Sequence, residues 1–207
     1  MLISTLYFLK KNNYLLVIIL AFLASLTRLV GVFLIIPIIF HFLKNKKSFL
    51  TLRSLILFAP IFGLLSYCFY LWQTTGDPLF FLTSQPIFGA NRSSHLIFLP
   101  QVYWRYLKIF VTAHWDFRYF VSILEFSFFS FVLIILILDL IKNYKSKIKN
   151  WERIALNIFS FVNLILPTLT GTFSSIPRYV LFSLSFFIYL AQIKNVFIKY
   201  LVIGIFM

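Results

Sequence analysis

Long apolar runs alternate with short polar segments along the whole chain. A helix that crosses a membrane needs about 20 predominantly apolar residues. We expect crossings at residues 52–72, 120–140, 154–169 and 178–192, and a further apolar run, YLVIGIFM, ends the sequence. The pattern predicts an all-α fold, a polytopic transmembrane helical bundle that forms one domain over residues 1–207, without a soluble domain or an internal repeat.

Residues 14–42 form the first apolar run, which Arg28 and Gly31 interrupt. The run fits either one tilted helix with Arg28 near its middle or a hairpin of two short helices, 14–26 and 29–42. Basic residues lie just before and just after the run, and basic loops stay on the cytoplasmic side. Placing both groups on that side requires an even number of crossings, so the charges favour the hairpin, with Arg28 at its tip.

The most polar, turn-rich stretch is QTTGDPLFFLTSQPIFGANRSSH, at residues 73–95. Irregular backbone between membrane helices must lie outside the bilayer or line a cavity, because lipid offers it no hydrogen bonds. The basic loops on the other side place this stretch outside. We therefore expect an extracytoplasmic segment at 73–118, with short interfacial helices at 79–83 and 101–112.

The charge of the chain lies mainly in its short loops. The net charge is +14, whereas 61% of the residues are hydrophobic and only 12% are charged. Basic loops beside helix ends orient membrane proteins and attract anionic headgroups. This pattern indicates membrane lipids as partners and argues against nucleic acid. The abundance of Lys, Asn, Ile and Phe is typical of AT-rich genomes and favours a bacterial cytoplasmic membrane over the ER membrane.

Both ends of the chain resemble interrupted helices. The start, MLISTLYFLKK, carries its basic pair after the apolar residues, which is the reverse of a signal peptide. It resembles the last turns of a helix, and the far end stops inside an apolar run. We expect the chain to be truncated at both ends.

The sequence holds five carboxylate side chains. Asp77 lies in a Gly-Asp-Pro turn and is the candidate support residue for a site, since Asp and Pro both favour turns. Asp139 precedes Lys142 by three residues, which predicts a pair on a helix surface. Glu152 falls on the cytoplasmic side.

Two further carboxylates fall near the outer ends of helices. Asp116 is expected to pair with Arg118 in an interfacial loop. Glu125 lies a turn or two into a helix that enters from outside. Its charge is favoured there by the helix dipole, although a place in the lining of a cavity is the alternative.

Three of the arginines on the outer side matter as a group: Arg28, Arg92 and Arg178. An arginine near lipid either reaches to the headgroups or faces a cavity or a partner. Arg178 follows a proline at a predicted helix start, where a cation opposes the helix dipole unless an anion is near. Because few carboxylates are available to pair with these arginines, we expect them to bind an anionic ligand such as a phosphate.

Other kinds of site have no signal in the sequence. The three histidines, His41, His95 and His114, lack the spacing of metal ligands, so no metal is expected. No glycine-rich phosphate loop occurs, and no cofactor is expected. Cys68 is the single cysteine and excludes an intrachain disulfide.

Three segments carry a resemblance to a known family. LASLTRLVGVF (23–33), GDPLFFLTSQ (76–85) and SIPRYVL (175–181) resemble, in order and separation, segments of the second GPI mannosyltransferase and its bacterial relatives. These are multi-spanning glycosyltransferases of the GT-C type. The resemblance covers most of the chain and corresponds to the later portion of the family.

The resemblance implies an activity and a set of site residues. It implies transfer of mannose from a polyprenyl-phosphate donor on the extracytoplasmic side. The matching positions are Arg28, Asp77, Gln85, Arg178 and Tyr179, with Arg92 added by its charge. The family's catalytic base is expected in an earlier outer loop that no segment of this chain matches. We therefore expect this chain to be inactive by itself.

Three other functions fit the same pattern. The first is a related GT-C enzyme that transfers another sugar. The second is a transporter or flippase for a lipid-linked sugar, in which the arginines line the translocation path. The third is a membrane subunit without catalytic activity. Transporters commonly consist of repeated halves. The sequence has no such repeat, which favours the enzyme.

Overall fold

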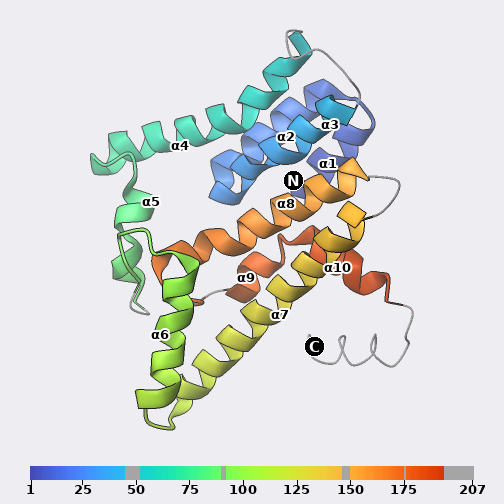
Figure 1. Ribbon diagram of the computed structural model, residues 1–207. Helices are drawn as coiled ribbons and strands as arrows, with labels where there is room; N and C mark the ends of the chain where they lie inside the picture. The colour runs from blue at the N-terminus through green and yellow to red at the C-terminus, as the bar shows by residue number, and fades with distance from the viewer. Residues whose placement is uncertain (45–51, 90–91, 146–149, 175, 194–207) are drawn as a thin grey trace.

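The computed structural model describes residues 1–44, 52–89, 92–145, 150–174 and 176–193, and every regular element in these ranges is helical (Figure 1). The elements are α1 (Leu2–Lys10), α2 (Tyr14–Thr27), η1 (Leu29–Leu34), α3 (Ile35–Lys44), η2 (Leu52–Phe58), α4 (Ala59–Thr75), α5 (Phe80–Thr83), η3 (Gln85–Phe88), α6 (Leu99–Thr112), α7 (Phe117–Lys145), α8 (Trp151–Ile165), η4 (Leu166–Thr170), α9 (Ile176–Val180) and α10 (Leu184–Ala191). The apolar run that ends the sequence and the basic loop residues Lys46, Lys47, Lys147 and Lys149 lie outside the described residues.

Three helical stretches in the described part are long and apolar enough to cross a membrane. They are Leu55–Thr75, Phe117–Lys145 and Trp151–Thr170. They agree with the crossings expected at 52–72, 120–140 and 154–169. The all-helical prediction is confirmed for the described residues, and their composition is that of a multi-pass membrane protein.

The chain turns back at Arg28, as the hairpin interpretation predicts. Arg28 is extended, with φ −152° and ψ 138°, and separates α2 from η1. Gly31 lies so close to α2 that a Cβ there would overlap the backbone of Ala24 and Ser25. Only a residue without a side chain permits this close return. The first apolar run is therefore two short helical pieces, with Arg28 between them.

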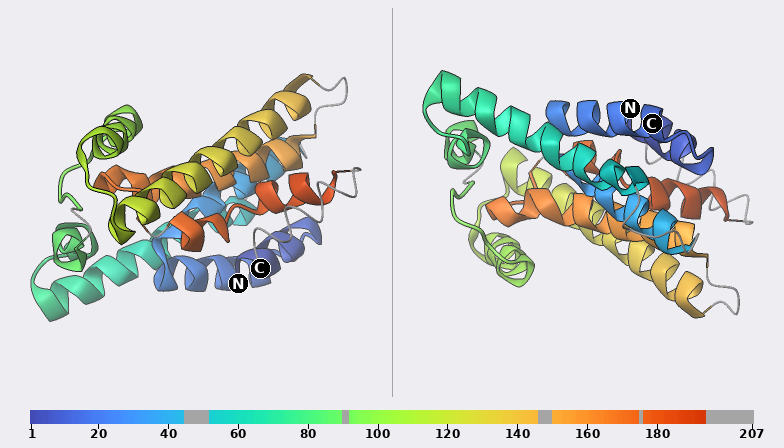
Figure 2. Two further views of the ribbon diagram at one scale, coloured as in Figure 1. Left: turned by 90° about the horizontal axis from the view of Figure 1, so that it is seen from below. Right: turned by 90° about the horizontal axis from the view of Figure 1, so that it is seen from above.

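Helix α8 is the centre of the described bundle. Figures 1 and 2 show α8 between α2, α3 and α4 on one side and α7 on the other. Phe159 of α8 belongs to the apolar cluster built around α2 and α3, and Leu164 belongs to the cluster built around α6 and α7. One helix therefore joins two apolar clusters.

A buried ion pair connects α7, α8 and α10. The Asp139 side chain is 1% exposed and the Arg153 side chain 10% exposed, and Arg153 Nη2 lies 2.8 Å from Asp139 Oδ1. Asn157 donates to Asp139 Oδ2 at 2.9 Å, Ser185 at 2.5 Å, and Asn143 donates to Oδ1 at 3.0 Å. The carboxylate thus receives donors from all three helices.

One prediction about this region is wrong. Asp139 does not pair with Lys142 on the surface, because its carboxylate is directed into the bundle toward Arg153. Arg153 lies in the first turn of α8, where its backbone amide donates to the Asn150 side chain at 3.2 Å. The Arg153 guanidinium contacts both oxygens of this carboxylate, and three further side chains donate to it. A single exposed lysine would form fewer and weaker hydrogen bonds.

The crossing expected at 178–192 is also wrong as a single helix. The structure has two short helices there, α9 and α10, separated at residues 181–183. Ser183 donates its hydroxyl to the Ser160 carbonyl at 3.3 Å, and the Ser185 amide donates to the Ser160 hydroxyl at 3.0 Å. These bonds to α8 compensate for backbone bonds that are lost where the helix is broken.

We predict that Asp139→Ala lowers the free energy of unfolding in detergent by about 3–5 kcal/mol, because it leaves Arg153 buried without its counter-charge. Glu152→Ala is the matched control. It removes the Lys44–Glu152 pair, whose side chains are 47% and 48% exposed, and should cost less than about 1 kcal/mol. Equal effects of the two substitutions on denaturant unfolding would contradict the structural role of the buried pair.

Candidate anion-binding site

The three outer arginines line one cavity. Arg28, Arg92 and Arg178 surround a space of about 440 Å³, and its other described lining residues are Phe88, Ser174, Tyr179 and Phe182. The arginines come from three separate segments: the turn after α2, the loop after η3, and α9. The structure thus brings together the group that the sequence indicated, although Phe88, Ser174 and Phe182 had no signal in the sequence.

No described lining residue of this cavity carries a carboxylate. Arg28 lies over the Phe182 ring, with its guanidinium carbon 5.3 Å from the ring centroid. Among the described residues, neither Arg28 nor Arg178 forms a salt bridge. The cavity wall is therefore strongly positive.

Each of the five carboxylates is engaged elsewhere. They accept hydrogen bonds or form ion pairs as follows: Asp77 with Leu79 and Thr83, Asp116 with the Tyr119 amide, Glu125 with Tyr106, Asp139 with Arg153, and Glu152 with Lys44. The expected Asp116–Arg118 pair is absent from the described residues, because Asp116 instead caps the first turn of α7. The arginine cavity gains no counter-charge from the chain's carboxylates.

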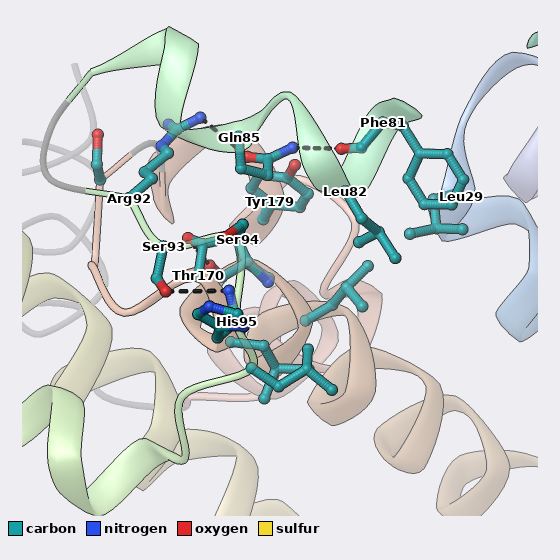
Figure 3. Close-up of a pocket in the computed structure, with 15 residues that line it drawn as sticks. Leu29, Phe81, Leu82, Gln85, Arg92, Ser93, Ser94, His95, Thr170 and Tyr179 are labelled. Carbon is teal, nitrogen blue, oxygen red and sulfur yellow. Dashed lines mark hydrogen bonds between the residues drawn. The ribbon is translucent and has the colours of Figure 1, made fainter. Parts of the chain in front are cut away.

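Gln85 links two parts of the outer segment beside this cavity. Its side-chain amide donates to the Phe81 carbonyl at 2.7 Å, and its side-chain oxygen accepts from Arg92 Nη1 at 3.5 Å. Figure 3 shows Gln85 between these two partners, above Tyr179. This part of the site is a narrower space of about 110 Å³, which shares Arg92, Ser174 and Tyr179 with the arginine cavity.

Two backbone hydrogen bonds hold the Arg92 loop against the end of α8. The Ser93 amide donates to the Thr170 carbonyl at 2.8 Å, and the Ile97 amide donates to the Leu169 carbonyl at 2.9 Å. Arg92 is one residue before the first of these bonds. A loop distant in sequence thus places its guanidinium beside α9.

Asp77 lies outside both spaces. Its two carboxylate oxygens accept from the Thr83 hydroxyl at 2.6 Å and from the Leu79 amide at 2.8 Å, which fixes the turn into α5. These two hydrogen bonds, the Thr83 bond first, hold the pKa of the Asp77 carboxyl below its ordinary value of 3.8. The geometry agrees with a support role, since α5 leads directly to Gln85.

An apolar cavity adjoins the arginine cavity. It has a volume of about 340 Å³ and shares Arg28 and Phe182 with it. Its remaining described lining residues are Met1, Leu2, Ile3, Ala24, Thr27, Val30, Gly31, Leu181 and Leu184. A positive cavity therefore borders an apolar one, with one arginine at the boundary.

Tyr106 and Glu125 form a polar pair at a separate cavity. The Tyr106 hydroxyl donates to Glu125 Oε2 at 2.7 Å and accepts from the Phe173 amide at 2.9 Å. Burial and, next, the adjacent Glu125 raise the pKa of Tyr106 above its ordinary value of 10.0, so the hydroxyl keeps its proton. Glu125 lines that cavity, which was the alternative left open for it.

The histidines do not gather. Among the described residues, no three His, Cys, Asp or Glu side chains are close enough to hold a metal ion. His95 lines the narrow space beside Gln85, and the Nε2 atom of His41 lies 3.2 Å from Asn12 Oδ1.

Comparisons of the chain with protein-family models, with curated proteins and with solved structures found no match.

We predict that the turn at Asp77 loosens in acid. A carboxyl whose pKa is depressed stabilises the turn above its ordinary pKa, and this contribution is lost as the pH falls through the lowered value. We would measure the protection factor of the Leu79 amide in hydrogen exchange at several pH values. It should fall between about pH 5 and pH 2. In Thr83→Val, which lacks the largest cause of the shift, the fall should begin at higher pH. Protection that is constant over this range would contradict the assignment.

Proposed function

We propose that this chain is part of a membrane glycosyltransferase of the GT-C type. It would transfer a sugar, mannose by the resemblance, from a polyprenyl phosphate to an acceptor on the extracytoplasmic side. The observation that carries the proposal is the border between the two cavities, where a positive space meets an apolar one at Arg28 and Phe182. A polyprenyl phosphate joins the same two chemistries in one molecule.

The arginines fit the phosphate end of such a donor. A guanidinium binds phosphate oxygens through paired, charge-assisted hydrogen bonds. Arg28 and Arg178 line the same cavity and form no salt bridge within the described residues. Arg92 lines it as well and contacts Gln85. Arg28 and Arg178 are exposed and Arg92 is half-buried, so a ligand can reach all three guanidinium groups.

The apolar cavity fits the first isoprene units of the lipid. Its wall is made of aliphatic residues from α1, α2 and the region between α9 and α10. Burial of hydrocarbon there adds affinity that the sugar phosphate alone lacks. Met1, Ile3 and Leu181 of this wall are exposed, and the rest of the lipid chain would extend over them.

The same groups fit the chemistry of transfer. The acceptor oxygen attacks the anomeric carbon of the sugar, the bond from that carbon to the phosphate oxygen breaks, and a carboxylate takes the hydroxyl proton. The departing lipid phosphate gains negative charge, which preorganised arginines stabilise. Arg28 and Arg178 have this role in the proposal. Asp77 supports the segment that holds Gln85, and the base belongs to a loop outside this chain's matching segments.

Because the base is expected outside this chain's matching segments, the test uses membranes of the cells that natively carry the gene. We predict that these membranes transfer radiolabelled mannose from polyprenyl phosphate and release free polyprenyl phosphate. Membranes from cells lacking the gene should do neither, and the gene should restore both. Complementation with Arg178→Ala should lower turnover by about 10²–10³-fold, because it removes a donor to the leaving phosphate. The measurement is chromatographic separation of the labelled products.

The control is Lys108→Ala, which removes an exposed basic residue of α6 that lines none of the cavities described for this chain. Its turnover relative to that of Arg178→Ala separates a local effect from a general loss of positive charge. Label that crosses the membrane without release of polyprenyl phosphate would instead indicate a transporter or flippase. Unchanged transfer after gene deletion would overturn the proposal.

A further inference from the structure

The largest of the cavities described for this chain lies between α6, α7 and the turn at residues 171–174. It has a volume of about 640 Å³. Arg105, Tyr106, Arg118, Glu125, Thr172 and Ser174 supply its polar wall. Ser174 also lines the arginine cavity, so the two spaces meet at this residue.

This cavity differs from the arginine cavity in its charge. It contains the carboxylate of Glu125 as well as two guanidinium groups, whereas the described wall of the arginine cavity has no carboxylate. A carboxylate repels a phosphate and accepts hydrogen bonds from hydroxyl groups. An arginine donates to hydroxyl oxygens. The mixed wall therefore suits a ligand with several hydroxyl groups.

Glu125 is fixed in position for such a ligand. Tyr106, which is 5% exposed, donates to Glu125 Oε2 at 2.7 Å and is itself held by the Phe173 amide at 2.9 Å. Glu125 Oε1 has no hydrogen-bond partner among the described residues. A carboxylate within an apolar helix is costly and is found where it meets a partner or a cavity. One oxygen thus remains available to accept a bond.

Thr172 provides a second, independent observation. It lines the cavity, is 7% exposed, and its hydroxyl has no hydrogen-bond partner within the described part of the chain. A buried hydroxyl without a partner costs about 1–3 kcal/mol, so such groups call for an explanation. A ligand hydroxyl in the cavity would satisfy it.

We propose that this cavity binds the acceptor, a molecule that presents a sugar or another polyhydroxylated headgroup, with one of its hydroxyl groups donating to Glu125. That the ligand is the acceptor rests on the proposed function. That the cavity binds a polyhydroxylated ligand rests only on Glu125, Tyr106 and Thr172. The shared residue Ser174 places this ligand next to the space assigned to the donor phosphate.

The test measures two ligands on the full chain in phosphatidylcholine nanodiscs. Methyl α-mannoside is the probe for the Glu125 cavity, observed by saturation-transfer NMR, and farnesyl phosphate is the probe for the arginine cavity. Glu125→Gln keeps the shape of the side chain but removes its charge. It should weaken mannoside binding about tenfold or more and leave farnesyl phosphate binding within about twofold.

Arg178→Ala is the reciprocal variant. It should weaken farnesyl phosphate and leave mannoside binding unchanged. If mannoside binds and depends on Glu125 whereas farnesyl phosphate does not bind, the proposed function fails and the hydroxyl-binding site stands. If farnesyl phosphate binds through Arg178 whereas mannoside binding is absent or indifferent to Glu125, the inference is overturned and the proposed function stands.

Thr172→Val separates binding from folding. The substitution removes an unpartnered buried hydroxyl, so the variant should unfold at the same or a higher temperature than the original chain. Mannoside binding should nevertheless weaken severalfold, because the ligand loses a partner. A stable variant with unchanged mannoside affinity would contradict the assignment, and this readout holds even if Glu125→Gln fails to fold.

Discussion

Scarcity of negative charge is the constraint on which the rest of this structure depends. The chain has 19 lysines and arginines but only 5 carboxylate side chains. The most buried of these carboxylates, Asp139, is committed to Arg153 at the junction of α7, α8 and α10. The other four are held by their own turns or by a single neighbour. The described wall of the arginine cavity accordingly carries positive charge that the chain's carboxylates do not balance, and we propose an external anion as its complement.

Packing constraints place the arginines where this charge can act. Gly31 lets the chain return closely against α2, so Arg28 lies at a tight turn. The bonds from Ser93 and Ile97 to η4 bring the outer loop to the end of α8. The same helix is bonded to the break between α9 and α10 through Ser160. Helix α8 thus connects the structural ion pair with two of the three segments that carry the arginines.

The sequence predicted features that follow from local pattern and missed those that follow from tertiary contact. Hydropathy was sufficient to predict the long apolar helices α4, α7 and α8. The basic residues on both sides of the first apolar run were sufficient to predict the turn at Arg28. Spacing suggested Lys142 as the partner of Asp139, whereas the actual partner, Arg153, lies on another helix. The break after α9 depends on serines whose partner is in α8.

The candidate site divides in the same way. Residue type and predicted side of the membrane were enough to group Arg28, Arg92 and Arg178, which line one cavity. The apolar cavity beside them is built from α1, α2 and residues near 181, and no local pattern indicates that these segments meet. Glu125 had two open interpretations, and its place in a cavity wall, which depends on tertiary packing, supports the second.

In the proposed function, the arginine cavity holds the phosphate of a lipid. The most direct measurement compares the dissociation constants of a polyprenyl phosphate and of the corresponding polyprenyl alcohol, which has the same hydrocarbon chain without the phosphate. The account predicts that the phosphate binds about a hundredfold more tightly, since two charge-assisted contacts are worth about 1.5 kcal/mol each or more. In the double variant Arg28→Gln/Arg178→Gln this preference should disappear. Equal affinities for the two lipids in the original chain, or a preference that survives in the double variant, would contradict it.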